Sequence, residues 1–260
     1  MADGRGADAL VVNNLAVLGI AGGATALATG LGAVPVFLMG ERARLLRPFL
    51  WGATVGLMSV AAVVGLLLPA LDEGEPGAVA AGLVVGVVFL LASRRVLESH
   101  DVHVGRLHGA GVRRSVLVFG VLFVHSLPEG FAIGTAYASD TEGLALFVIL
   151  AIALQNVPEG TSVAIPMESA GFGRAQQFWA AVVTSAPQPV GAIAAYLAVE
   201  TVAGLLPFSF AFAAGAMLAL VLFELVPQAF ARRGRAVAVG GSLLGGGLML
   251  ALAAGLGVEG

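Results

Sequence analysis

The chain has 260 residues, of which 58% are hydrophobic and only 11% charged, with a formal net charge of −3. Soluble domains carry about 25% charged residues, so this composition excludes a soluble protein and indicates an integral membrane protein without nucleic-acid partners. There is no cysteine, which excludes disulfides and thiolate ligands, and no lysine, which excludes a Schiff-base chromophore.

Eight apolar runs divide the chain, each close to or longer than the ~20 residues that cross a bilayer. In chain order they are Leu10–Met39, Phe49–Leu71, Gly77–Leu97, Ser115–Ala138, Gly143–Pro166, Ala175–Val199, Pro207–Phe230 and Ala236–Val258. No polar stretch between them is long enough for a soluble domain. We therefore predict an all-α polytopic membrane protein, with residues 1–260 forming one transmembrane domain of eight helices.

The loops between these runs alternate in charge. Twelve of the 13 arginines follow the first, third, fifth or seventh run or, as Arg94 and Arg95 do, lie in the last residues of the third, whereas the other loops carry carboxylates and no arginine. The positive-inside rule assigns the arginine-rich loops to the cytoplasm. We therefore predict a multi-pass protein of the cell membrane with both termini outside.

Two related hexapeptides lie within the fourth and fifth runs. They are His125-Ser126-Leu127-Pro128-Glu129-Gly130 and Gln155-Asn156-Val157-Pro158-Glu159-Gly160. Each places a glutamate after a proline at membrane depth, where a charge costs about 2.5–3.5 kcal/mol on insertion scales and usually marks function.

The two hexapeptides belong to neighbouring spans, so they run through the membrane in opposite directions. A weaker match relates the second and seventh runs: Gly56-Leu57-Met58 with Leu68-Pro69-Ala70, and Gly215-Ala216-Met217 with Val226-Pro227-Gln228. These antiparallel matches predict an inverted repeat. Many transporters have this architecture, with their site at the midplane between the repeats.

The spacing within each hexapeptide predicts a cation site. Residues four apart share a helix face, which pairs His125 with Glu129 and Gln155 with Glu159. Two carboxylates match a divalent cation in charge, and a mixed oxygen and nitrogen set suits zinc better than magnesium or calcium. The alternative is that the prolines only shape the helices and the glutamates are protonated or hydrogen-bonded.

The flanking residues suggest how the two helices meet. Each proline frees a backbone carbonyl and tends to kink its helix. The glycines that follow, Gly130 and Gly160, remove bulk, so we expect the fourth and fifth helices to approach each other closely there.

A loop over residues 98–114 holds three of the four histidines: His100, His103 and His108. Short histidine-rich tracts bind metal loosely. A solvated cytoplasmic linker explains the same residues equally well.

The paired motifs, the charge pattern and the histidine-rich loop resemble the ZIP (Zrt/Irt-like) transporters, which bring divalent metals into the cytoplasm. The resemblance covers nearly the whole chain and implies a primary site of His125, Glu129, Gln155 and Glu159. It also implies that the transported metal is zinc, iron, manganese or cadmium, with no resident cofactor.

The resemblance extends to secondary ligands. Met58 matches a position that can add a thioether, and Ser126, Asn156 and Gln188 stand where the family often has stronger ligands. Family members with a full set can hold two metals. Because these positions are neutral here, we predict one metal per site.

Rival interpretations remain at this stage. A proton-linked carrier of an organic solute would use the same buried glutamates and histidine, and a metal-permeable channel would share the site. An enzyme is not expected, because only one histidine lies within a predicted span. Because carboxylates and imidazole must be deprotonated to bind a metal, we expect weaker metal binding at acidic pH. Small residues occur in many of the predicted helices, so a homodimer is possible.

Overall fold

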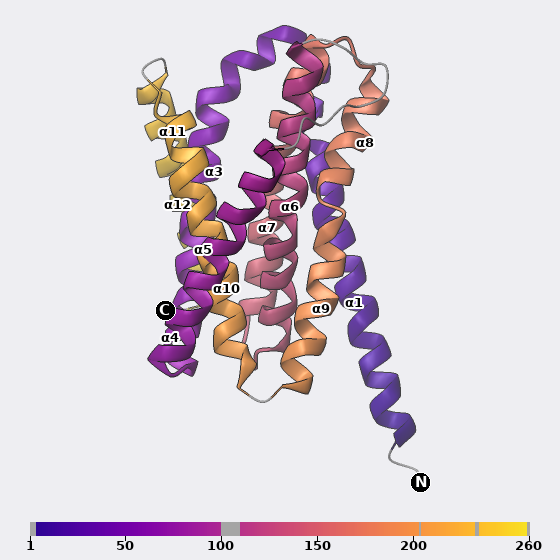
Figure 1. Cartoon of the computed structure of the whole chain (residues 1–260), viewed down its shortest axis with the longest axis vertical. Helices are drawn as coiled ribbons and strands as arrows, with labels where there is room; N and C mark the ends of the chain where they lie inside the picture. The colour runs from indigo at the N-terminus through magenta and orange to yellow at the C-terminus, as the bar shows by residue number, and fades with distance from the viewer. Residues whose placement is uncertain (1–3, 100–109, 203, 232–233, 259–260) are drawn as a thin grey trace.

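The computed structural model describes residues 4–99, 110–202, 204–231 and 234–258, which are helical apart from short turns (Figure 1). Within them, eight helical stretches are long and apolar enough to cross a membrane, which confirms the predicted number. The largest difference in an end is at the second span, which begins at Arg42 rather than Phe49.

Several spans consist of more than one helical piece, so the structure has more elements than spans. In chain order the elements are α1 (Gly4–Leu31), α2 (Val34–Met39), η1 (Gly40–Leu46), α3 (Arg47–Ala62), η2 (Val63–Leu67), α4 (Leu68–Glu73), α5 (Pro76–Ser99), α6 (Ala110–Ala138), α7 (Leu144–Ser169), α8 (Arg174–Thr184), α9 (Pro187–Thr201), α10 (Leu205–Leu220), η3 (Val221–Leu225), α11 (Val226–Ala229) and α12 (Arg235–Gly255).

The second and seventh spans each contain a π-helical turn, η2 and η3, that ends two residues before a proline. Proline has no N–H to donate, so the carbonyl four residues earlier loses its helical partner and the helix rearranges locally. That carbonyl belongs to Gly65 before Pro69 and to Phe223 before Pro227, and both lie inside the π-turns. The shared irregularity supports the predicted relationship between these two spans.

The spans form two groups (Figure 1). The site group contains α1, α6, α7, α8 and α9, and the flanking group contains α3, α4, α5, α10, α11 and α12. The main packing pairs are α6 with α9 and α1 with α7 in the site group, and α3 with α12 and α5 with α10 in the flanking group. The spans can be exchanged two by two: one with six, two with seven, three with eight, and four with five. This exchange converts the α6–α9 pair into the α7–α1 pair, and the α3–α12 pair into the α10–α5 pair. This is the packing expected of an inverted repeat.

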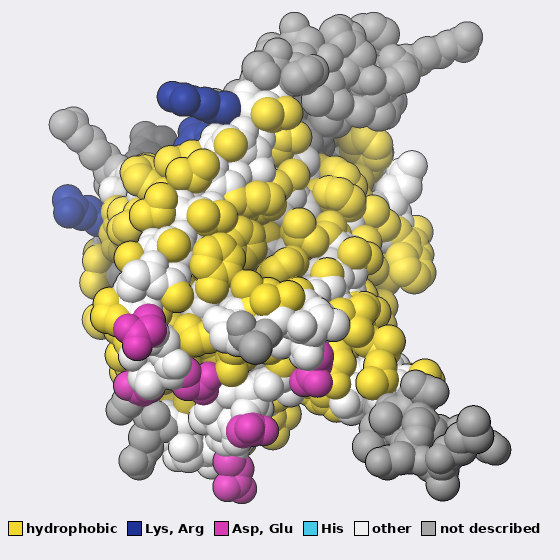
Figure 2. Space-filling view, turned by 60° about the horizontal axis from the view of Figure 1, so that its bottom comes forward, with side chains coloured by type: hydrophobic (Ala, Val, Ile, Leu, Met, Phe, Trp, Pro, Cys, Tyr) yellow, Lys and Arg dark blue, Asp and Glu magenta, His cyan; other side chains and the backbone are white. Residues whose placement is uncertain are grey.

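Charged side chains lie at the two ends of an apolar belt. Figure 2 shows carboxylates gathered at one end and arginines at the other, with hydrophobic side chains between them. The exposed acidic residues come from the ends of α4 and α9 and from the turns after α4 and α6: Asp72, Glu73, Glu75, Asp140, Glu142 and Glu200. The chain therefore has an acidic face and an arginine-rich face, as the alternation of charge predicted.

The predicted loop over residues 98–114 is shortened from both sides, because α5 continues to Ser99 and α6 begins at Ala110. Its three histidines, His100, His103 and His108, lie outside the described residues.

Candidate metal centre

Three ionisable side chains from the two hexapeptides meet between α6 and α7. His125, Glu129 and Glu159 each offer a ligand atom, and these atoms all lie within 4.8 Å of one another. His125 and Glu129 are fully buried, and Glu159 is 5% exposed. The spacing of four residues places the histidine and Glu129 on one face of α6, and α7 supplies the second carboxylate from across the helix pair.

The amide of Gln155 completes this arrangement. Its Nε2 donates to Oε1 of Glu129 at 2.7 Å, and the same Oε1 lies 3.4 Å from Nε2 of His125. The structure thus brings together all four residues of the predicted primary site.

Several buried atoms of this cluster have no hydrogen-bond partner. They are both ring nitrogens of His125, Oε1 of Gln155 and Oε1 of Glu159. Buried polar groups are nearly always paired, so four unpaired atoms in one cluster require an explanation. One imidazole, two carboxylates and an amide oxygen form a donor set that suits a borderline divalent metal such as zinc.

A second layer of amides holds Glu129 from the other side. Nε2 of Gln188, at the start of α9, donates to Oε2 of Glu129 at 2.7 Å. Its Oε1 accepts from the hydroxyl of Thr25 at 2.7 Å and from Nδ2 of Asn156 at 3.2 Å. Because an ionised carboxylate only accepts hydrogen bonds, the amide nitrogen must face it. Gln188 therefore contacts the glutamate as a donor.

Asn156 is also engaged in this network. Its Nδ2 donates to the backbone carbonyl of Thr25 at 2.7 Å, and its Oδ1 accepts from Gln188 at 3.3 Å. Thr25 was not identified from the sequence, where it is a threonine in an apolar run. No local motif distinguishes it.

The other two predicted ligands lie in different surroundings. The hydroxyl of Ser126 donates to the carbonyl of Leu122 within α6 at 2.9 Å. Met58 is completely buried in a large apolar cluster that also includes Ile133 and Met217. A ligand role for either residue stays a prediction.

The glycines of the hexapeptides do not have the predicted neighbours. A Cβ on Gly130 would lie 2.2 Å from the carbonyl oxygen of Gln188 on α9, and one on Gly160 would lie 1.7 Å from that of Thr29 on α1. The expectation that they let α6 and α7 approach each other was therefore wrong. They bring α6 against α9 and α7 against α1, because the backbones cross at these points in each pair.

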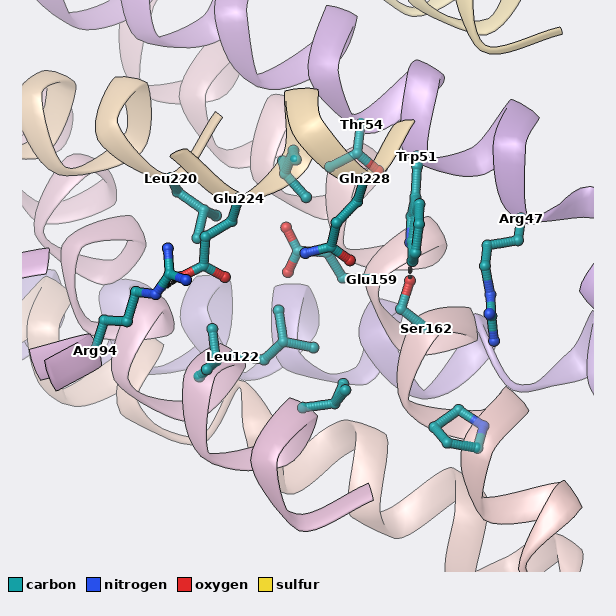
Figure 3. Close-up of a pocket in the computed structure, with 14 residues that line it drawn as sticks. Arg47, Trp51, Thr54, Arg94, Leu122, Glu159, Ser162, Leu220, Glu224 and Gln228 are labelled. Carbon is teal, nitrogen blue, oxygen red and sulfur yellow. Dashed lines mark hydrogen bonds and ion pairs between the residues drawn. The ribbon is translucent and has the colours of Figure 1, made fainter. Parts of the chain in front are cut away.

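A cavity of about 270 Å³ adjoins the centre between the two helix groups (Figure 3). It extends from Glu159 to Arg47 and Arg94, which belong to the arginine-rich face. Trp51 of the flanking group lines it and donates from Nε1 to the hydroxyl of Ser162 in the site group at 3.1 Å. Of the three clustered side chains, Glu159 is the one that lines this cavity.

Comparison with known proteins relates this architecture to one family. Residues 91–253 match the family model described as ZIP zinc transporter. A candidate zinc transporter of Arabidopsis thaliana is 35% identical over 80% of this chain, which spans only 33% of the plant protein.

Two bacterial relatives match over more of their own length. The zinc transporter GufA of Myxococcus xanthus is 32% identical over 77% of this chain and 84% of the relative. The zinc transporter ZIPB of Bordetella bronchiseptica is 31% identical over 93% of this chain and 81% of the relative. The family model covers more than half of the residues, and the chain therefore belongs to the ZIP zinc transporter family.

Proposed function

We propose that this protein carries a divalent transition metal, zinc before iron(II), manganese or cadmium, across the cell membrane into the cytoplasm. The observation that carries the proposal is the buried cluster of ligand atoms from His125, Glu129 and Glu159, in which the ring nitrogens of His125 and Oε1 of Glu159 have no hydrogen-bond partner. The relatives named as zinc transporters support zinc as the cargo.

The charge of the centre fits this cargo. Glu129 and Glu159 are both buried, and two neighbouring carboxylates in such surroundings repel each other unless a cation lies between them. A divalent ion bound by both carboxylates, with the imidazole of His125 and the amide oxygen of Gln155, would balance their charge and use the unpaired atoms.

The proposed centre holds one metal. A second ion beside Glu129 would approach Oε2, but that oxygen accepts from Gln188, whose amide is joined to Asn156 and Thr25. The network supplies a donor where a second cation would otherwise lie. Two divalent ions would also bring four positive charges against two negative ones.

The proposed direction rests on an asymmetry between the two faces. Toward the arginine-rich face, which the positive-inside rule assigns to the cytoplasm, Glu159 adjoins the cavity. On the acidic face the two helix groups are tied together: Ser139 and Thr141, in the turn after α6, donate to Oε1 of Glu73 on α4 at 3.3 and 3.4 Å. This arrangement suits release toward the cytoplasm.

The test is metal uptake by purified protein in liposomes. Wild type, the Glu129→Ala/Glu159→Ala double variant and a Glu200→Ala control would each be offered zinc, manganese, iron(II) and cadmium separately. Glu200 is an exposed carboxylate on the acidic face, so its loss changes net charge without touching the centre.

We expect saturable zinc uptake by wild type and by the control, and none by the double variant. Uptake that does not saturate would indicate a channel. If folded wild type takes up no metal, the proposal fails and a carrier of an organic solute becomes the better explanation.

A further inference from the structure

The cavity beside Glu159 contains a second carboxylate and two arginines. Glu224, in the π-turn η3, faces it from the seventh span, and Arg47 and Arg94 face it from the second and third spans (Figure 3). Positive charge is unexpected along the path of a cation, because a lining of one sign attracts ions of the other. The lining thus pairs two acidic with two basic side chains, and the presence of the basic pair needs an explanation.

Arg94 and Glu224 lie next to each other in this lining. Nε of Arg94 is 3.9 Å from Oε1 of Glu224, and their side chains are 38% and 13% exposed. Arg94 comes from α5 of the flanking group, and Glu224 comes from η3, which joins α10 to α11 in the same group. Glu159 comes from α7 in the site group. The contact between the guanidinium and Glu224 therefore lies within one helix group.

We propose that Arg94 sets the rate at which metal leaves the protein, by neutralising Glu224 so that the cavity does not bind the departing ion a second time. The inference rests on the proposed function. Without Arg94, the cavity lining would keep both carboxylates, Glu224 and Glu159, but would lose one of its two positive charges. A divalent ion is attracted twice as strongly as a monovalent one, and more so in a partly buried cleft than in water. Retention there would slow each transport cycle.

Arg94 is a positioning and charge-balancing residue rather than a ligand, so its effect must be separated from a merely structural ion pair. Loss of a structural pair would lower stability or lower uptake at every metal concentration. Loss of charge balance would lower the maximal rate and also lower the half-saturating concentration, because the ion is held more tightly. A defect caused by lost charge balance would also be corrected by a second substitution that removes the negative charge of Glu224.

The experiment compares zinc uptake by wild type, Arg94→Gln, Arg94→Gln/Glu224→Gln and the control Arg95→Gln in liposomes. Arg95 is the next residue on α5, exposed and outside the residues that line the cavity. Wild-type uptake first establishes the transport activity itself, so that failure of the proposed function is recognised separately.

We expect Arg94→Gln to lower the maximal rate at least fivefold and the half-saturating zinc concentration severalfold. The double variant, again with balanced charge, should recover to within twofold of wild type, and Arg95→Gln should match wild type. Unchanged kinetics in Arg94→Gln would overturn the inference. So would a slow Arg94→Gln that the second substitution does not correct, or equal slowing by Arg95→Gln.

Discussion

The hydrogen bond from Gln188 to Glu129 can be removed without changing any proposed metal ligand. Replacing Gln188 by methionine keeps the length of the side chain and its burial but eliminates the donor that lies 2.7 Å from Oε2 of Glu129. The carboxylate would then keep Gln155 as its amide donor, at Oε1. Glu129 would be less firmly oriented toward His125 and Glu159.

The size of the effect follows from the charge on the acceptor. A hydrogen bond to a charged group contributes about 1.5–3 kcal/mol, and each 1.4 kcal/mol is roughly a tenfold change in affinity. Groups that orient a metal ligand typically change metal affinity about 10–100-fold when they are removed. The two estimates agree. We therefore expect Gln188→Met to raise the half-saturating zinc concentration about 10–100-fold, with a smaller change in the maximal rate.

The assay is zinc uptake over a range of concentrations in liposomes, and the chain offers a matched control. Gln177 on α8 is also fully buried and donates from Nε2 to Oε2 of Glu168 at 2.6 Å, outside the candidate centre. Gln177→Met should keep the wild-type half-saturating concentration. A wild-type value for Gln188→Met would refute the orienting role. An equal rise in both variants would show that losing a buried amide is enough to explain the effect.

Two further predictions concern the hexapeptides. Gln155→Ala should reduce zinc uptake only in part, because it removes a neutral oxygen. Glu159→Ala should abolish uptake, because it removes half of the negative charge of the centre. Equal uptake by both variants and wild type would contradict the assignment. Gly160→Ala should lower stability by about 3 kcal/mol, because its Cβ would lie 1.7 Å from the carbonyl oxygen of Thr29, whereas Gly23→Ala meets nothing within 4 Å. Thermal unfolding of both glycine variants in detergent tests this, and equal melting temperatures would refute the packing argument.

The spans and the clustering of the hexapeptide side chains could be predicted from the sequence because each depends on local information. Hydropathy over about 20 residues identifies a span, and a spacing of four residues places His125 and Glu129 on one helix face. The neighbours of Gly130 and Gly160 could not be predicted in this way. A small residue permits close approach of a helix, but nothing in the local sequence states which helix approaches.

The hydrogen-bond network of Gln188 and Thr25 around Glu129 could not be predicted from the local sequence either. Gln188 was identified only through family resemblance, as a weak ligand, and Thr25 was not identified at all. Their roles depend on hydrogen bonds between residues that are 163 positions apart in the chain. Only the packing of α1 and α9 against the hexapeptides brings these groups together.

The inverted repeat explains why the two glutamates occupy different surroundings. The repeat relates the contact of Gly130 with Gln188 on α9 to the contact of Gly160 with Thr29 on α1, so Gln188 and Thr29 stand at corresponding positions. The long amide reaches Oε2 of Glu129, whereas the short hydroxyl of Thr29 pairs with that of Ser185 at 2.6 Å.

Glu129 is consequently fixed by two amides, while Oε1 of Glu159 has no hydrogen-bond partner and its side chain faces the cavity. Symmetric backbones with side chains of unequal length thus give one anchored carboxylate and one that is available at the cavity. Under the proposed function, Glu129 would hold the cation and Glu159 would pass it to the cavity.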